Sequence, residues 1–167
     1  MGTELIELCE QWQEWAAAAD QSEDGWQSDF PQWSALILAA CFAMTDPKGQ
    51  HTFLPQIELC WRISEETEDM ADFAKEQGED CWPVLVLLAQ SEFAEVRWQV
   101  YSVLPLFGSK AEPLLRVALH DPDAYCKRRA LLSLASLHPR DSLALKARFM
   151  HDSDPYIRRA AEEFKGS

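Results

Sequence analysis

The second half of the chain repeats itself with a period of 30 to 31 residues. Residues 83–90 (PVLVLLAQ) align with residues 113–120 (PLLRVALH), and the alignment continues downstream into equivalent pairs of an apolar or small residue and a base. These pairs are Val96-Arg97, Cys126-Lys127 and Ile157-Arg158. A fixed period of this length indicates a stack of similar units, each of which needs a neighbour to bury its apolar face.

Each repeat has the form of a helix pair. A short apolar helix is followed by a turn that contains Asp and usually Pro, as at Asp121-Pro122 and Asp154-Pro155, and a second helix then opens with the apolar-basic pair. This pattern resembles the HEAT-repeat family of α-solenoids, with the match clearest over residues 81–161. The resemblance implies an all-α superhelix in which neighbouring helix pairs stack on one another.

We predict a single helical-repeat domain over residues 1–167. Residues 1–80 are expected to form divergent acidic pairs, and residues 81–167 three regular HEAT-like repeats. A polar last helix, carrying Glu162 and Glu163, is what a capping repeat requires. The expected array has about five antiparallel helix pairs, over residues 5–45, 54–77, 82–108, 112–138 and 141–165.

The first half of the chain lacks the repeated signature, so its helices are predicted from apolar periodicity and end signals. Apolar residues recur at steps of three and four over residues 5–19, which is typical of an amphipathic helix. The 16 uncharged residues from 30 to 45 predict a buried helix that is too short to span a membrane. A third helix is expected to begin near Pro55, and Ser64 to cap a fourth. The inner stripe of the fourth helix would be Met70, Phe73 and Ala74.

Charge is distributed unevenly along the chain. The sequence has 28 acidic and 15 basic residues, a net charge of −13. Residues 1–80 hold 18 acidic and three basic residues, which gives −15, whereas residues 81–167 hold 10 and 12, which gives +2. A strongly acidic surface repels nucleic acid and anionic lipid. We therefore expect neither as a partner, and the acidic half favours a basic protein instead.

Neither the cysteines nor the short motifs point to a reaction. The five cysteines are scattered and odd in number, which favours a reducing cytoplasm, and Cys9 and Cys41 are expected to fill the core. The sequence has no phosphate-binding loop, serine-nucleophile motif or zinc-protease motif. The His-Asp pairs at 120–121 and 151–152 recur with the repeat and are not expected to bind a metal. We predict a protein that is monomeric when free, with no cofactor and no catalytic residues.

Three basic residues, Arg97, Lys127 and Arg158, occupy equivalent positions, so stacking would bring them into a row. Two interpretations are open. The row either binds phosphates or carboxylates of a partner, or pairs with the turn acids of its own and neighbouring repeats. The second is favoured because acids and bases recur together. The available acids are Asp121, Asp152 and Asp154.

The acidic half contains the candidate partner-binding residues. They are expected to share one face of the fourth helix, which in a HEAT-like array would lie on the concave surface. The acidic residues of this face are Glu65, Glu68, Asp69, Asp72 and Glu76. Trp26 lies in the acidic connection, away from any helical stripe, and is the candidate aromatic anchor. An ordinary solvated helix face is the alternative.

These features favour a non-catalytic module whose acidic concave surface engages a basic protein. An immunity protein that neutralises a bacterial toxin is the specific case. By fold analogy, a HEAT-like enzyme such as a DNA glycosylase or a tetrapyrrole lyase is an alternative, and Arg97, Trp98 and Arg129 could supply parts of a glycosylase groove. A structural adaptor or chaperone is the third hypothesis.

Overall fold

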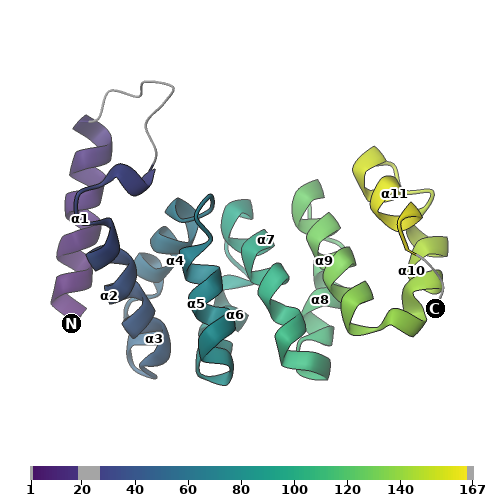
Figure 1. Cartoon of the computed structure of the whole chain (residues 1–167), viewed down its shortest axis with the longest axis horizontal. Helices are drawn as coiled ribbons and strands as arrows, with labels where there is room; N and C mark the ends of the chain where they lie inside the picture. Colours follow the sequence, from purple (N-terminus) through teal and green to yellow (C-terminus); the bar gives the residue numbers. More distant parts are fainter. Residues whose placement is uncertain (1, 19–26, 165–167) are drawn as a thin grey trace. The chain divides into compact units, whose positions relative to one another are not determined.

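The computed structural model describes residues 2–18 and 27–164, and every regular element in these ranges is a helix (Figure 1). The expected all-α fold of helix pairs is therefore confirmed. The chain divides into two compact units, Met1–Ser91 and Glu92–Ser167, which we name the N-terminal unit and the C-terminal unit. The sequence of the N-terminal unit has a net charge of −15, from 18 acidic and three basic residues, and that of the C-terminal unit has +2, from 10 and 12.

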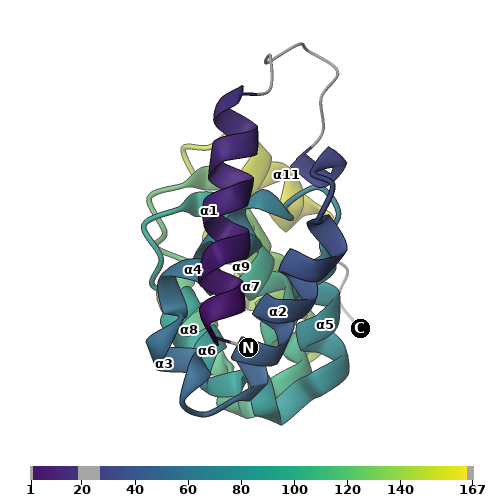
Figure 2. The ribbon, with the colours of Figure 1, turned by 90° about the vertical axis from the view of Figure 1, so that its left-hand side faces the viewer.

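The N-terminal unit is organised around helix α2. Its α-helices are α1 (Gly2–Ala18), α2 (Trp33–Thr45), α3 (Gly49–Thr52), α4 (Leu54–Ile63), α5 (Asp69–Gln77) and α6 (Trp82–Leu88). Short 3₁₀ helices, η1 (Gln27–Asp29) and η2 (Gly78–Cys81), precede α2 and α6. Helix α2 contacts α1, α4 and α5, and it lies between α1 and α5 (Figure 2). The side chains of α2 therefore take part in most of the packing of this unit.

The core of the N-terminal unit combines apolar and aromatic side chains. Helix α1 turns its predicted apolar stripe inward. The buried residues of this stripe are Leu5, Leu8, Cys9 and Trp12. Trp61 of α4 is fully buried, and its indole N–H donates to the sulfur of Met44 in α2 at 3.4 Å. Trp61 therefore links the packing of α4 to that of α2.

The beginning of α5 differs from the prediction. Ser64 does not cap this helix, because it ends α4, where it is buried and donates its hydroxyl to the Trp61 carbonyl at 3.5 Å. Helix α5 begins at Asp69, directly after Glu68, whose φ of 55° lies in the left-handed region. Five residues, 64–68, thus separate the two helices, and the first of the predicted acidic residues, Glu65, lies among them.

Two glycines that are 30 residues apart share one backbone conformation. Gly78 has φ 59° and ψ −123°, and Gly108 has φ 56° and ψ −138°. Residues with a Cβ atom rarely adopt this region. Gly78 lies between α5 and α6, and Gly108 lies between α7 (Ala94–Val103) and α8 (Glu112–Ala118). The 30-residue period therefore extends upstream to the end of α5, beyond the residues whose sequences repeat.

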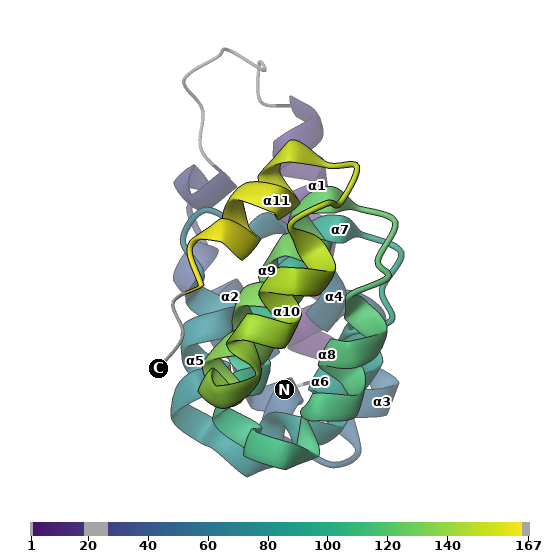
Figure 3. The ribbon, with the colours of Figure 1, turned by 90° about the vertical axis from the view of Figure 1, so that its right-hand side faces the viewer.

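The C-terminal unit consists of α7 and α8 together with three further α-helices. These are α9 (Ala124–Leu137), α10 (Ser142–Phe149) and α11 (Pro155–Glu162), with 3₁₀ helices η3 (Leu104–Lys110) and η4 (Pro139–Asp141) between pairs. Helix α9 contacts α7, α8 and α11, and α10 packs beside α11 (Figure 3). Helix α11 buries Ile157 and Ala160 and exposes Tyr156 and Glu162, as a capping repeat requires.

Pairs of aspartates shape the turns of the C-terminal repeats. Asp123 accepts a hydrogen bond from the backbone N–H of Cys126 at 2.9 Å and so caps α9. Asp154 caps α11 in the same way, through the N–H groups of Tyr156 and Ile157 at 2.7 and 3.2 Å. In each turn the aspartate two residues earlier accepts from the backbone N–H of the capping one. These earlier aspartates are Asp121, at 2.9 Å, and Asp152, at 3.0 Å.

The row of bases pairs with these same turns. The Nε and Nη2 atoms of Arg97 donate to the two carboxylate oxygens of Asp121, both at 2.8 Å, and the Tyr101 hydroxyl adds a third bond at 3.0 Å. Lys127 pairs with Asp152 in the following turn. Arg158 donates to two carbonyl oxygens of its own turn. The structural interpretation of the row is therefore confirmed for Arg97 and Lys127, whereas Arg158 donates to backbone carbonyls of its turn. We name these contacts the turn ladder.

The turn ladder lowers the pKa of both acceptor aspartates. Burial alone would raise the pKa of Asp121, but hydrogen bonds from Arg97, from the backbone N–H of Asp123 and from Tyr101 outweigh it. The pKa of Asp152 is lowered by the same balance, with Lys127 as the basic partner. Because the folded state binds these protons more weakly than the unfolded state, the ionised aspartates stabilise the fold.

We expect this stabilisation to disappear in acid. It is fully present above the ordinary pKa of Asp, about 3.9, and is lost as the pH falls through the lower pKa of the folded state. Asp121→Asn should therefore be less stable than the wild type at pH 7, and its stability should fall less on acidification. Urea unfolding of both proteins between neutral and acid pH measures the difference. Stability curves that run parallel over the whole range would contradict this assignment.

Candidate functional site

A groove lies between α2 and α5 in the N-terminal unit. Its volume is about 400 Å³. The lining residues of α2 are Trp33, Ser34, Ile37, Leu38 and Cys41, and those of α5 are Asp69, Asp72, Phe73 and Glu76. We name this hollow the acidic groove, because three of its four α5 residues are carboxylates.

The spacing of the α5 residues explains why they share the groove. Asp69, Asp72, Phe73 and Glu76 stand at steps of three and four, which places them on one helix face. The remaining apolar residues of α5, Met70, Ala71 and Ala74, are buried. Helix α5 is therefore anchored by small and flexible apolar side chains, and its acidic face is left beside α2.

Asp69 is engaged within the chain. The indole N–H of Trp33 donates to its Oδ2 atom at 3.0 Å, and the Thr67 hydroxyl donates to the same oxygen at 2.7 Å. A hydrogen bond to an ionised acceptor is stronger than a neutral one. Asp69 thus joins the first turn of α2 to the first turn of α5 and holds the Trp33 ring at the wall of the groove.

Asp72 and Glu76 are the more accessible carboxylates. Both are exposed. Lys75 donates to Asp72 at 2.7 Å and lies 3.7 Å from Glu68, so one cation stands among the acids of this helix. Exposed ion pairs of this kind contribute little, because solvent screens them. The groove therefore keeps a negative charge that a basic ligand can reach.

The structure brings together some of the predicted acidic residues and separates others. Asp69, Asp72 and Glu76 line the groove. Glu65 lies in the turn after α4, and Glu68 precedes α5 in a left-handed conformation, so neither lies among the lining residues. The single face expected for all five acids is therefore wrong for these two, because the helix begins later than predicted. Trp26 lies outside the described residues.

Two aromatic residues of the groove, Trp33 and Phe73, are not indicated as site residues by the sequence. In the sequence Trp33 begins an apolar run, and the apolar periodicity predicts Phe73 on the inner stripe of α5. Both are half-buried and line the groove instead. The shared spacing of Phe73 with Asp69, Asp72 and Glu76 was the available signal. The sequence contains no comparable signal for Trp33, because its hydrogen-bond partner Asp69 is 36 residues away.

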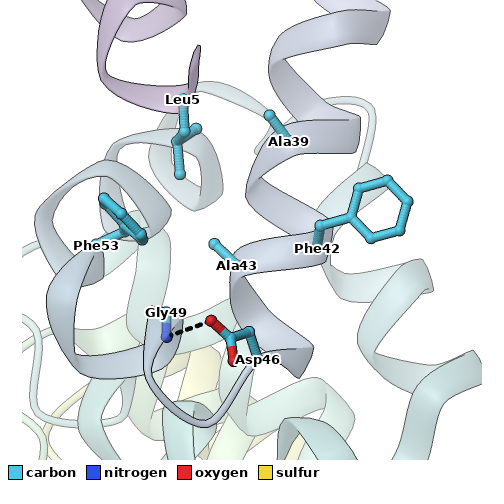
Figure 4. Close-up of a pocket in the computed structure, with 7 residues that line it drawn as sticks. All are labelled: Leu5, Ala39, Phe42, Ala43, Asp46, Gly49 and Phe53. Atoms are coloured by element: carbon cyan, nitrogen blue, oxygen red, sulfur yellow. Dashed lines mark hydrogen bonds between the residues drawn. The ribbon is translucent and has the colours of Figure 1, made fainter. Parts of the chain in front are cut away.

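A smaller apolar hollow lies on the other side of α2, with a volume of about 80 Å³ (Figure 4). Its lining residues are Leu5, Ala39, Phe42, Ala43, Asp46, Gly49 and Phe53. The carboxylate of Asp46 accepts from the backbone N–H of Gly49 at 2.9 Å, which closes one end. The ring of Phe42 points away from the hollow and is half-exposed. We name this feature the apolar hollow.

Other candidate side chains make contacts within the fold or are buried in it. The guanidinium of Arg129 lies 5.1 Å from the ring centroid of Trp98 and 5.4 Å from that of Tyr125, within cation–π range. All five cysteines are free and buried. Burial raises the pKa of Cys41 and Cys126 to about 12 and that of Cys81 to about 11, so these three are protonated thiols at neutral pH.

The described part of the chain has neither a cluster of metal ligands nor a membrane-spanning helix. Within residues 2–18 and 27–164, no group of three or more His, Cys, Asp or Glu side chains is arranged to hold a metal ion. Among the helices of the described part of the chain, none is both long and apolar enough to cross a membrane.

Comparison with known proteins gives one finding. The family model that describes HEAT repeats matches residues 82–164. No curated protein and no solved structure matches this chain. The matched residues run from the beginning of α6 past the end of α11, and the acidic groove lies upstream of them.

Proposed function

Residues 82–164 belong to the HEAT-repeat family, and on this basis we propose that the chain is a non-catalytic protein-binding module whose acidic groove engages a basic protein. The proposal rests on one observation above all. In the acidic groove, three carboxylates stand beside the rings of Trp33 and Phe73. Arg and Lys side chains bind to such a combination through charge-assisted hydrogen bonds and cation–π contacts.

The charge of the N-terminal unit supports the same proposal. The groove belongs to a unit whose sequence has 18 acidic and three basic residues, and this excess of acids gives the unit a negative field. Such a field attracts a basic protein over distances of about a Debye length and speeds its association, and added salt screens it. The C-terminal unit, which has a net charge of only +2 and holds three of its 12 bases in the turn ladder, serves in this proposal as the structural part of the module.

A finer proposal is that the basic partner is a bacterial toxin and that this chain is its immunity protein. An acidic inhibitor neutralises a cationic toxin by covering the surface with which the toxin binds its own target. We further propose that the protein works in the cytoplasm as a monomer. The five free thiols support a reducing compartment, and mutual repulsion of the acidic surfaces disfavours self-association.

Charge reversal in the groove tests the proposal. We expect wild-type protein to retain a basic protein from a lysate of its native organism, and Asp72→Lys/Glu76→Lys to bind that protein at least about tenfold more weakly. The matched control is Glu7→Lys/Glu14→Lys, which changes the net charge equally on exposed positions of α1 that do not line the groove. Quantitative mass spectrometry identifies the retained protein, and titration gives its affinity.

Several results would contradict this function. The wild type could retain no basic protein, or the two double variants could bind the partner equally weakly, so that only net charge matters. Binding that persists unchanged at about 1 M salt, where the Debye length is about 3 Å, would also exclude an electrostatic groove. A retained basic protein that is a toxin would support the finer proposal, and one with another activity would overturn it.

A further inference from the structure

Helix α2 has an unusual surface for a helix that is partly exposed. Its 13 residues, WSALILAACFAMT, contain no charged side chain. A helix that is apolar on all sides is normally buried on all sides. In this structure, however, Leu38 is 56% exposed and Phe42 is 52% exposed. The expectation of a buried helix over residues 30–45 is therefore wrong for this face.

The two exposed residues join the two hollows. Leu38 and Phe42 are four positions apart and so lie on one face of α2. Leu38 lines the acidic groove, and Phe42 stands at the edge of the apolar hollow with its ring directed away from it (Figure 4). We name the surface formed by Leu38, Phe42 and the apolar hollow the α2 strip. The strip and the groove together form a continuous surface that is apolar along one side and acidic along the other.

The chemistry of this surface selects one kind of occupant. We infer that the α2 strip binds an amphipathic helix of the basic partner, whose apolar side chains cover Leu38 and Phe42 and whose basic flank enters the acidic groove. The inference rests on the proposed function and adds to it the secondary structure of the partner and the placement of its apolar face. Amphipathic helices dock on such surfaces with apolar anchors at steps of three and four residues.

The apolar hollow fits this mode of binding. A cavity of 150 Å³ lined by aliphatic and aromatic side chains takes up benzene. The hollow, at about 80 Å³, therefore has room for one aliphatic side chain such as Val or Leu. Its floor includes Leu5 and Ala43, which are buried, so an entering side chain would meet an apolar surface.

Charge argues against the other occupants of an apolar strip. A second copy of this chain would bring a second acidic groove against the first, and like charges placed opposite one another at an interface oppose binding. An anionic membrane surface is repelled for the same reason. An amphipathic helix with basic residues along one flank makes apolar contacts with the α2 strip and ionic contacts with the acidic groove. It is therefore the occupant that the observations favour.

Two synthetic peptides provide a direct test. The first is an amphipathic peptide of Leu, Ala and Arg whose leucines form one stripe with arginines on one flank. The second has the same composition, scrambled to break the stripe. We expect the first to bind to wild-type protein about tenfold more tightly than the second, with both affinities falling as salt is added. Fluorescence anisotropy of labelled peptides measures both.

Variants separate the strip from the groove. Leu38→Gln/Phe42→Gln should lower the affinity for the striped peptide to that for the scrambled one and leave its salt dependence intact. Asp72→Asn/Glu76→Gln should weaken the binding of both peptides and reduce the salt dependence. Leu143→Gln/Val117→Gln is the matched control, because it removes two exposed apolar side chains from helices of the C-terminal unit, and it should change neither.

The outcomes distinguish this inference from the function on which it rests. Equal, salt-sensitive binding of both peptides would overturn the inference and leave the acidic groove as the binding site. Binding of the striped peptide that ignores both salt and the groove variant would overturn the proposed function and the inference together. Binding of neither peptide would overturn the inference. A wild type that dimerises in analytical ultracentrifugation, and a Leu38→Gln/Phe42→Gln variant that does not, would make the strip a self-interface and overturn it as well.

Discussion

Asp121→Ala should lower the free energy of unfolding by about 3–5 kcal/mol, because it leaves a buried guanidinium without its counter-ion. The Arg97 side chain is 11% exposed and that of Asp121 is 3% exposed. The substitution also removes the acceptor of the Tyr101 hydroxyl and of the Asp123 backbone N–H. Urea unfolding at neutral pH, followed by circular dichroism, measures the loss.

The repeat supplies the control for this prediction. Asp152 stands in the equivalent turn, but its Lys127 partner is 21% exposed and donates from a single ammonium group. Asp152→Ala should therefore be less damaging, at about 1–2 kcal/mol. In Arg97→Met/Asp121→Ala no unpaired charge remains, so the loss should be smaller than the sum of the two single losses. Equal and small losses for Asp121→Ala and Asp152→Ala would show that burial of the pair does not matter.

Trp61→Ala should destabilise the N-terminal unit by about 3–5 kcal/mol, the range for removing a large aromatic side chain from a core. Trp61 is fully buried, and its indole N–H contacts the sulfur of Met44, which is also fully buried. The cavity would therefore open between α4 and α2. Chemical denaturation measures the effect, and limited proteolysis shows whether cleavage sites appear within residues 1–91.

Trp61→Phe is the conservative comparison. It keeps an aromatic ring in the core and removes only the outer part of the indole and its N–H, so a loss of about 1–2 kcal/mol is expected. If Trp61→Ala and Trp61→Phe destabilise the protein equally, the loss comes from the contact with the Met44 sulfur rather than from the cavity. A loss below about 1 kcal/mol for Trp61→Ala would contradict the central role of this residue in the core.

The repeated half of the chain could be predicted in detail from its sequence. A period of 30 to 31 residues carries tertiary information, because equivalent positions must make equivalent contacts in a stack. The pairing of Arg97 and Lys127 with turn aspartates followed from this symmetry. The double role of each turn, with one aspartate capping the helix and the other accepting the base, is a matter of geometry that the symmetry alone does not reveal.

The acidic groove was only partly predictable, for two physical reasons. The beginning of α5 depends on a left-handed residue, Glu68, at a position where the sequence has no glycine to indicate it. The exposure of Leu38 and Phe42 depends on which sides of α2 are covered by α1, α4 and α5. Because α2 has no polar face, its own sequence does not indicate the side left in solvent.

The turn ladder also has a consequence for how the repeats recognise one another. Arg97 and Lys127 pair with aspartates that lie 24 and 25 residues further along the chain. The same ion pair can therefore form with any repeat whose turn carries such an aspartate. Exchanging or deleting a repeat would leave this pairing of base and turn aspartate possible. The cluster of Trp98, Tyr125 and Arg129 distinguishes the pairing of α7 with α9. In the repeat that follows, Tyr156 corresponds to Tyr125, but Arg128 and Ala160 stand at the positions of Trp98 and Arg129. The order of the repeats is therefore encoded by the side chains that break the symmetry.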